Sequence, residues 1–341
     1  MPGETVNPYV RTSDETTFED SLRPATFADF IGQKQVKENL DVAIKAARKR
    51  REPLDHILFS GLPGLGKTTL ARIISLEMKS QLHLTSGPIL KRPADLVGTL
   101  TKLEEGDVLF IDEIHRMLAD VEEFLYTAME DYFVSINIEQ KGQGRAITLP
   151  LKRFTLVGAT TREGLLSQPL RDRFGILEKL DFYPVADLVR ILKRSAGILK
   201  VAIDDDAGVI VGERSRGTPR IANRYLRRVR DVAQAKFNSN RINGAVVAEA
   251  LKMLGVDGAG LEEMDRKILH AILQQGGRAV GVKAISVAVG EQEDTIEEVY
   301  EPYLIQQNFI QRTSQGRKAT DKAKKHLGWK ATETEAQQKL F

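Results

Sequence analysis

The sequence predicts an α/β domain, a parallel sheet with helices on both faces, followed by a small all-helical domain and a C-terminal winged-helix domain. Between residues 23 and 182, short apolar runs alternate with stretches of helical periodicity, which is typical of buried parallel strands separated by helices. After Pro184 the strand-like runs vanish, and a glycine-rich segment at 255–260 indicates a second boundary. We therefore expect domains at 1–183, 184–254 and 255–341, with a frayed tail in the last dozen residues.

Individual elements follow from local pattern. The runs 56–59, 108–111 and 154–157 predict buried strands. Two alternating segments, 133–138 and 145–149, are joined by glycines and predict a β-hairpin inserted at about 133–149.

The C-terminal third predicts helices and one further hairpin. An apolar stripe of Ile221, Tyr225, Leu226 and Val229 predicts a helix with arginines on its other side. Helices are expected over 261–273, 283–289 and 295–307, and a strand, turn and strand over 309–317. Three helices followed by a hairpin are typical of a winged helix, although some domains that do not bind DNA share the pattern.

Composition excludes several classes of protein. The 341 residues are 42% hydrophobic and 28% charged, as in a soluble globular protein. No run reaches the roughly 18 apolar residues of a membrane span, and the acidic N-terminal segment lacks the apolar core of a signal peptide. There is no cysteine, and the five histidines show no close pairing, so neither disulfides nor a zinc site are expected. We expect a cytoplasmic protein without membrane contact.

Positive charge is concentrated in two blocks although the net charge is only +3. Residues 214–230 contain seven arginines and no acid, and residues 312–330 contain seven basic residues and one aspartate. Such blocks favour contact with phosphate, in a nucleotide or a nucleic acid. A solvated charged face is the alternative for each block.

A phosphate-binding loop is the most specific motif. Gly-Leu-Pro-Gly-Leu-Gly-Lys-Thr at 61–68 follows a predicted strand and opens a predicted helix. Its glycines let backbone N–H groups surround phosphates at a helix N-terminus. Lys67 is expected to neutralise the β- and γ-phosphates of ATP, and the Thr68 hydroxyl to bind Mg²⁺.

Two acids end the next apolar run. Asp112 closes the run 108–111 and can hold Mg²⁺ through water, and Glu113 beside it can polarise the attacking water. Phosphoryl transfer also needs positive charge on the γ-phosphate, for which Arg171, Arg173 and Arg220 are candidates. Thr160 or Thr161, after the run 154–157, can orient the water. These motifs predict an ATPase.

Together these residues resemble the AAA+ ATPases, and within them the RuvB family of Holliday-junction branch-migration motors. The motifs that carry the resemblance extend from about residue 20 to 328. They are Leu-Arg-Pro at 22–24, Ile-Gly-Gln at 31–33, Thr-Ser-Gly-Pro at 85–88, Phe-Ile-Asp-Glu-Ile-His at 110–115, Ala-Met-Glu-Asp-Tyr at 128–132, Gly-Ala-Thr-Thr-Arg at 158–162, Pro-Leu-Arg-Asp-Arg-Phe-Gly at 169–175, Arg-Gly-Thr-Pro-Arg-Ile-Ala-Asn at 216–223, Glu-Pro-Tyr-Leu-Ile-Gln-Gln at 301–307 and Arg-Thr-Ser-Gln-Gly-Arg at 312–317.

The resemblance implies a homohexameric ring that encircles duplex DNA and works with RuvA and the RuvC resolvase complex. It also implies a role in recombination, DNA repair and the SOS response, near the nucleoid. It implies ATP and Mg²⁺ as cofactors, with ATP between the large and helical domains. The nucleotide-binding residues that it implies are Leu22, Arg23, Gly64, Leu65, Gly66, Lys67, Thr68, Thr69, Glu130, Asp131, Tyr132, Tyr183 and Arg220.

The resemblance also implies roles outside the nucleotide site. Arg173 matches the arginine finger that reaches a neighbour's ATP, and Thr161 the polar residue that senses the γ-phosphate; whether Thr160 or Arg171 shares these roles stays open. The hairpin 133–149 matches a RuvA-docking hairpin, and its Phe133, Ile136, Ile138, Ile147 and Leu149 suit a hydrophobic docking surface unless they pack on their own domain. Arg312 and Arg317 match contacts to the DNA backbone. We expect them at the base and tip of the wing. Replacing both with alanine should flatten the plot of log K for DNA binding against log salt concentration by about 2.

Two other classes of protein compete with a DNA motor. A protein-remodelling AAA+ machine would need an aromatic pore-loop residue, of which the sequence offers no convincing example. A nucleotide-switched regulator without sustained turnover would not need both Glu113 and a finger. The ATPase rate with duplex DNA or with unfolded protein discriminates among them.

Overall fold

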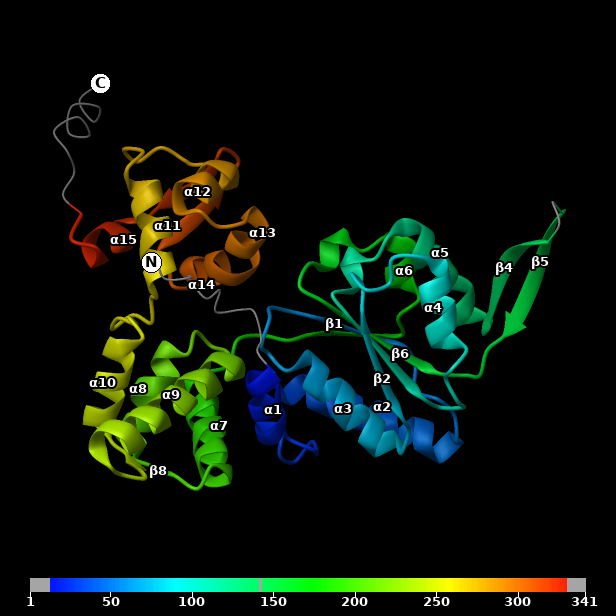
Figure 1. Ribbon diagram of the computed structural model, residues 1–341, viewed down its shortest axis with the longest axis horizontal. Helices are drawn as coiled ribbons and strands as arrows, with labels where there is room; N and C mark the ends of the chain where they lie inside the picture. The colour runs from blue at the N-terminus through cyan, green and yellow to red at the C-terminus, as the bar shows by residue number, and fades with distance from the viewer. Residues whose placement is uncertain (1–12, 141–142, 330–341) are drawn as a thin grey trace. The chain divides into compact units, whose positions relative to one another are not determined.

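Five parallel strands form the central sheet of the first of the chain's two structural units, Met1–Tyr183 and Pro184–Phe341. The structure is a computed structural model that describes residues 13–140 and 143–329. The strands are β1 (Ile57–Ser60), β2 (Leu82–Ser86), β3 (Val108–Asp112), β6 (Thr155–Thr160) and β7 (Ile176–Lys179), in the order β2-β3-β6-β1-β7 (Figure 1). All neighbouring pairs are parallel, which confirms the predicted parallel sheet and its three buried strands.

The strands at the two edges of this sheet were not predicted. In β2 no residue is fully buried, and Leu84 is 50% exposed; in β7 only Glu178 is buried, and Leu177 is 53% exposed. An edge strand has a neighbour on one side only, so its sequence lacks the continuous apolar run that marks a central strand. Only pairing with β3 and β1 identifies these two segments as strands.

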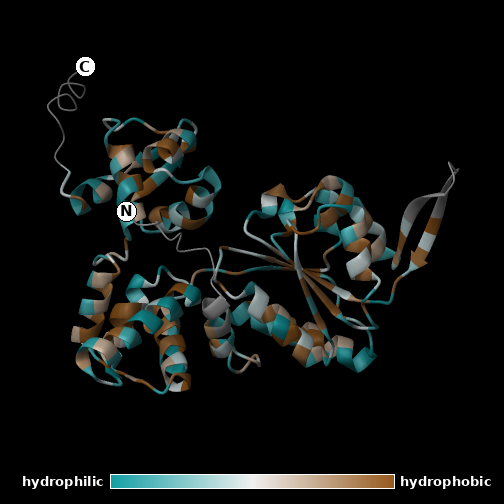
Figure 2. Ribbon diagram, in the orientation of Figure 1, coloured by the Kyte–Doolittle hydropathy of each residue, from teal (hydrophilic) through white to brown (hydrophobic). Residues whose placement is uncertain are grey.

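Helices cover both faces of the sheet. In Figure 1, α1 (Ser13–Leu22), α2 (Lys34–Arg50) and α3 (Lys67–Met78) lie on one side, and α4 (Pro93–Leu100), α5 (Ala119–Glu130) and α6 (Gln168–Asp172) on the other. Leu58, Leu109, Ile111 and Leu156 form a core with the second group, and the central strands are the most uniformly hydrophobic part of the unit (Figure 2). No helix of the described residues is long and apolar enough to cross a membrane.

The inserted hairpin is present as β4 (Phe133–Gln140) and β5 (Gln143–Pro150), and it projects from the sheet domain (Figure 1). Its register pairs Val134 with Leu149 and Ile136 with Ile147. Because side chains alternate along a strand, Phe133 lies on the opposite face, so the prediction of one apolar surface that includes Phe133 is wrong. Val134 is fully buried and Leu149 packs against the domain core, so the base of the hairpin packs on its own domain. The side chains of Ile136 and Ile138, like residues 141–142, lie outside the described part of the chain.

The second unit begins with four helices, α7 (Val185–Ile198), α8 (Asp205–Arg214), α9 (Pro219–Phe237) and α10 (Gly244–Met253). The predicted stripe on α9 is buried at Tyr225, Leu226 and Val229. The expectation of helices alone needs a small correction, since β8 (Ala202–Ile203) and β9 (Arg241–Ile242) form a two-residue parallel pair. Strands this short carry no periodicity that a sequence pattern reveals.

The winged-helix elements follow as α11 (Glu263–Leu273), α12 (Val282–Val289), a third helix and a hairpin, which confirms the predicted order. The third helix is continuous through α13 (Glu293–Thr295), the π-helical turn η3 (Ile296–Tyr300) and α14 (Glu301–Gln306). The wing consists of β10 (Ile310–Thr313) and β11 (Gly316–Ala319), and α15 (Asp321–His326) follows it; the tail at 330–341 lies outside the described residues.

The segment 255–260 is more than a glycine-rich connection. Arg216, which is 2% exposed, forms an ion pair with the fully buried Asp265 and donates to the Gly260 carbonyl at 3.1 Å. Glu262 accepts from Arg224 and, at 2.8 Å, from the Tyr225 hydroxyl. Burial raises the pKa of Asp265 to about 6, against the opposing effect of Arg216. Buried charges need such partners, so these bonds join the helical segment to α11.

Candidate nucleotide site

The phosphate-binding loop lies between β1 and α3, as predicted. The loop starts after Ser60, and α3 begins at Lys67. Gly61 and Gly66 have φ angles of +142° and +112°, a region that residues with a side chain rarely adopt. A Cβ at Gly61 would lie 2.7 Å from the Leu180 carbonyl oxygen, and one at Gly66 would lie 3.0 Å from the Phe30 ring. Both positions therefore require glycine for conformation and for space.

Lys67 is buried inside this loop, with 7% of its surface exposed. Its Nζ donates to the carbonyl oxygens of Gly61 at 2.5 Å and Leu62 at 3.1 Å. The ammonium group is thus held against the backbone that would surround a phosphate. A phosphate oxygen would take the place of a neutral carbonyl as its acceptor and form a stronger, charge-assisted bond.

Of the other predicted nucleotide residues, Tyr183 contacts this loop directly. Tyr183 is 5% exposed and its hydroxyl donates to the Leu65 carbonyl at 3.0 Å. The Leu65 side chain is buried, so Leu65 can offer a ligand only its backbone. Leu22 is also buried, and Arg23 pairs with Asp20 at 3.0 Å. Thr68 and Thr69 are partly exposed in the first turn of α3, next to Gly64 and Gly66 in the loop.

The two acids end β3 in a strained turn. Asp112 is the last residue of the strand, and its Oδ1 accepts from the Glu113 N–H at 3.0 Å. Glu113 has a φ of 48°, which costs a residue with a side chain about 1–3 kcal/mol. The Gly87 N–H donates to the Asp112 carbonyl at 2.8 Å, and a Cβ at Gly87 would lie 2.4 Å from the Glu113 carbonyl oxygen. The loop after β2 thus holds the acidic turn in place.

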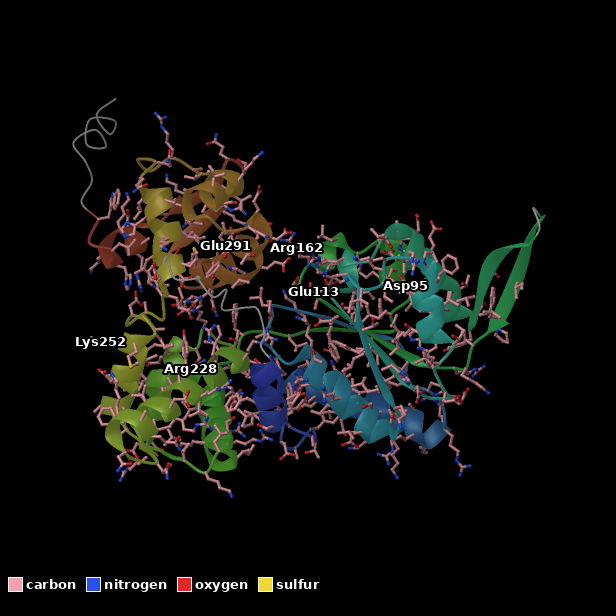
Figure 3. All side chains as sticks on the ribbon, viewed as in Figure 1. Asp95, Glu113, Arg162, Arg228, Lys252 and Glu291 are labelled. Carbon is pink, nitrogen blue, oxygen red and sulfur yellow. The ribbon has the colours of Figure 1, made fainter. Side chains whose placement is uncertain are left out.

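The ends of three strands bring these groups to one edge of the sheet. β6 lies between β3 and β1, and the Thr160 carbonyl accepts from the Gly61 N–H at 3.1 Å. The Thr161 hydroxyl donates to Glu113 Oε2 at 3.4 Å. Thr160 is fully buried and contacts His115 instead. Thr161 is therefore the threonine that reaches the acid directly, while Glu113 and Arg162 lie at the same edge (Figure 3).

Arg173 lies away from this edge. It follows α6, close to the start of β7, where the Ile176 N–H donates to the His56 carbonyl before β1 begins. Its guanidinium donates to Glu130 Oε2 at 3.0 Å and to the Pro169 carbonyl at 2.8 Å, and lies 4.6 Å from the centre of the Tyr126 ring. Arg173 and the phosphate-binding loop are thus at opposite ends of the strands. Arg171 pairs with Gln168 at 2.6 Å.

The segment Glu130-Asp131-Tyr132 does not join the phosphate-binding loop of its own chain. Met129, just before it, accepts through its carbonyl from His56, which precedes β1, and the Tyr132 ring packs edge-on against Phe154, which precedes β6. Both contacts are at the amino ends of the strands. Within one chain these residues are away from the loop, because the chain reverses at α5 and returns to the opposite edge of the sheet; their contact with a nucleotide stays a prediction. They lie with Arg173 instead.

The predicted DNA-binding arginines form one cross-strand pair in the wing. Arg312 and Arg317 are register partners, so the expectation that they occupy base and tip is wrong. Both donate to Glu301, which is 1% exposed: Arg312 Nε at 2.7 Å and Arg317 Nε at 3.0 Å. Burial opposes the charge of Glu301, but the two arginines hold its pKa below the usual range. The Arg312 side chain is 56% exposed and that of Arg317 only 12%.

Comparison with known proteins identifies the family of this chain. Models of the RuvB P-loop domain, the RuvB AAA lid domain and the RuvB C-terminal winged-helix domain match residues 22–180, 183–257 and 258–328. The chain belongs to the RuvB family. The Holliday junction branch migration complex subunit RuvB of Pediococcus pentosaceus is 52% identical over 320 residues, which are 94% of this chain and 95% of that protein.

Two further relatives cover nearly the whole chain. The subunit of the same name from Kosmotoga olearia is 53% identical over 310 residues, 90% of each chain. The solved structure of the Thermotoga maritima RuvB Holliday junction branch migration motor has a TM-score of 0.84 and 48% identity, and the match covers 92% of this chain and 100% of that one. Membership of the RuvB family makes this chain a P-loop ATPase.

The donor set at the loop fits the magnesium ion that RuvB-family chemistry implies. Mg²⁺ prefers oxygen ligands and keeps several waters, with one or two carboxylates and substrate phosphates. Thr68 and Asp112 supply a hydroxyl and a carboxylate at the same edge of the sheet. No cluster of three or more acids, histidines or cysteines suited to a metal occurs among the residues that the structure describes.

Arg220 lies in the first turn of α9 in the second unit, directly after Pro219 and three residues after Gly217. Its contact with nucleotide stays a prediction. Sequence reasoning missed the role of four residues around the motifs, namely Gly87, His115, Glu297 and Glu301. Only His115 carried a signal, as a histidine two residues after Glu113 at the end of a buried strand; the others act through contacts distant in sequence.

Proposed function

We propose that this chain is an ATP-driven motor that moves duplex DNA and drives branch migration of Holliday junctions, as a homohexameric ring together with RuvA. One observation carries the ATP-driven part: the phosphate-binding loop, the acids Asp112 and Glu113 and the sensor Thr161 meet at one edge of the sheet. The DNA substrate is supported by the names of the relatives and by the wing arginines.

In this proposal each group has one role in hydrolysis. The loop N–H groups and Lys67 bind the β- and γ-phosphates of ATP, and Thr68 and Asp112 hold Mg²⁺, which neutralises charge that develops on the phosphate oxygens. Glu113 accepts a proton from the attacking water, and Thr161 orients that carboxylate. The backbone of the acidic turn is already fixed by Gly87, so little reorganisation is needed when ATP binds.

Completion of the site by a neighbouring subunit supports the ring. Arg173 lies at the amino ends of the strands and cannot reach the loop at their carboxyl ends within one chain. In the proposed head-to-tail ring, the amino edge of one subunit faces the carboxyl edge of the next. Arg173 then serves as the finger for a neighbour's ATP, and Glu130, bound to it, belongs to the same shared site.

The wing, not the third helix, is the part that fits the DNA backbone. The third helix carries Glu293, Asp294, Glu297, Glu298 and Glu301, and no lysine or arginine occurs between Lys283 and Arg312. An acidic helix is repelled by the phosphates that line a major groove. Contact through Arg312 positions the protein without reading sequence, as a motor requires.

Arg312→Ala is expected to weaken binding to all duplexes alike and to flatten the plot of log K against log salt concentration by about 1. Arg317 is largely buried against Glu297 and Glu301, so it holds the wing more than it contacts phosphate. We therefore expect the two arginines together to contact about one phosphate, so that replacing both changes the salt slope by about 1 and not by about 2. Fluorescence anisotropy with duplexes of unrelated sequence over a salt series measures the slope.

Lys318→Ala is the matched control, because Lys318 pairs with Gln311 and lies on the other face of the wing. An unchanged slope for this variant is expected. A flattened slope for Lys318→Ala with none for Arg312→Ala would place DNA on that other face.

The hairpin of β4 and β5 is the proposed docking site for RuvA. It projects from the sheet domain, and the Ile136–Ile147 pair lies beyond the Val134–Leu149 pair that packs on the domain core (Figure 1). Leu149 packs on the domain core and Phe133 lies on the opposite face, so neither belongs to the docking surface in this proposal. A place in the RuvC complex, a role in the SOS response and a cytoplasmic location at the nucleoid belong to the same proposal.

The proposed function is tested by the ATPase rate and by junction processing. Duplex DNA should stimulate ATP hydrolysis, and a synthetic four-way junction should be dissociated only when ATP and RuvA are both present. Stimulation by unfolded protein and not by DNA would instead identify a protein-remodelling machine. An ATPase rate that neither duplex DNA nor unfolded protein stimulates would favour a nucleotide-switched regulator.

A further inference from the structure

His115 is a buried histidine that the mechanism above leaves without a role. It lies in the 3₁₀ turn η1 (Ile114–Arg116), directly after the acidic turn, and its side chain is 3% exposed. Its Nδ1 lies 2.9 Å from the Thr160 hydroxyl, and its Nε2 lies 3.4 Å from Glu113 Oε2. The imidazole therefore bridges the end of β6 and the carboxylate that acts on water.

The partners of this ring determine its tautomer. A carboxylate accepts but cannot donate, so the Nε2 beside Glu113 carries the hydrogen. Nδ1 of the neutral ring is then an acceptor, and the Thr160 hydroxyl donates to it. The Thr160 oxygen in turn accepts from the Arg162 N–H at 3.0 Å. A chain of donors thus runs from the backbone after β6 through Thr160 and His115 to Glu113.

Glu113 needs such support for its side chain. Gly87 fixes the backbone of the turn, but the carboxylate itself is 28% exposed at the catalytic edge. His115 Nε2 and the Thr161 hydroxyl oxygen each lie 3.4 Å from Glu113 Oε2. Thr161 contacts the carboxylate itself, whereas Thr160 contacts His115. The Thr161 hydrogen bond is long and the imidazole lies within ion-pair range of the carboxylate. Catalytic contacts are often long before substrate binds and tighten in the reactive complex.

We propose that His115 is a positioning residue for ATP hydrolysis: it orients the Glu113 carboxylate and couples it to Thr160 at the end of β6. The proposal rests on the proposed function in one respect, the role of Glu113 as the base. It assigns Thr160 and Thr161 different tasks, Thr161 acting on Glu113 directly and Thr160 acting through the imidazole.

The test compares three substitutions by kcat, KM for ATP, the Kd of a non-hydrolysable ATP analogue and the melting temperature. His115→Ala should lower kcat by roughly tenfold to a hundredfold, the loss expected when a hydrogen bond to a charged group is removed, with analogue binding within about twofold of wild type. In His115→Gln the side-chain amide can take the position of Nε2 and donate to Glu113, so most of the turnover should return. In His115→Asn the amide reaches only the position of Nδ1, so turnover should stay low.

The Gln and Asn variants are matched in chemistry and differ in reach, so they decide the proposal even where His115→Ala does not fold. If kcat follows the melting temperature across the three variants, and Asn and Gln are alike, His115 is merely part of the core and the proposal is overturned. Thr160→Val, which removes the hydroxyl and keeps the volume, should reproduce a part of the His115→Asn loss; wild-type turnover would contradict the coupling to Thr160.

A double-mutant cycle separates this proposal from the role of Glu113 itself. In a Glu113→Gln background, single-turnover hydrolysis should be slowed less than about twofold by His115→Ala, because both changes act through one carboxylate. An equal loss in both backgrounds overturns the positioning role while leaving Glu113 as the base. Near-wild-type turnover of Glu113→Gln alone refutes the base and, with it, this proposal.

Discussion

Glu113→Gln is expected to bind ATP as the wild type does and to hydrolyse it at least about 10²-fold more slowly. The amide keeps the size of the side chain and can still contact Thr161 and His115, but it cannot accept the proton of the attacking water. The phosphate-binding loop and Lys67, which lie on the other side of β6, remain intact. Single-turnover hydrolysis and equilibrium binding of labelled ATP measure the two effects separately.

Lys67→Ala is the contrasting variant. It removes the buried ammonium group from the loop, so the affinity for ATP itself should fall. Near-normal turnover by Glu113→Gln, or unaltered ATP affinity of Lys67→Ala, would each remove the residue concerned from its proposed role.

Arg173→Ala is expected to keep nucleotide binding and to lose turnover, because its guanidinium acts on the ATP of the next subunit. The physical reason is the position of Arg173 at the amino ends of the strands, opposite the loop. Mixing this variant with Lys67→Ala should restore activity. A ring with random one-to-one composition has about a quarter of its sites with both an intact loop and an intact neighbouring finger.

Arg171→Ala is the matched control for this experiment, since Arg171 lies in α6, two residues before Arg173, and pairs with Gln168. Wild-type turnover by Arg171→Ala would assign the finger to Arg173 alone, and a comparable loss would show that the two arginines share it. The absence of rescue in mixed rings would contradict a role in trans and point to action on the same chain.

The sequence alone determined the features whose physics is local. A strand, a glycine turn and a helix start follow one another at 57–67, so the backbone conformation that binds phosphate is encoded within about a dozen residues. The same holds for β3 with Asp112 and Glu113, and for the buried strands β1, β3 and β6, whose apolar runs are continuous because both faces are covered.

Only the tertiary structure decided which side chains meet across strands and which edge they occupy. The pairing of Arg173 with Glu130 moves the segment 130–132 out of its own chain's nucleotide site. The register of the wing places Arg312 beside Arg317, and the distant Glu297 and Glu301 neutralise them to different extents. Contacts such as those of His115 with Thr160, or of Gly87 with the acidic turn, join residues separated by 25 or more positions. A local pattern cannot reveal them, because periodicity records which face is buried and not which neighbour covers it.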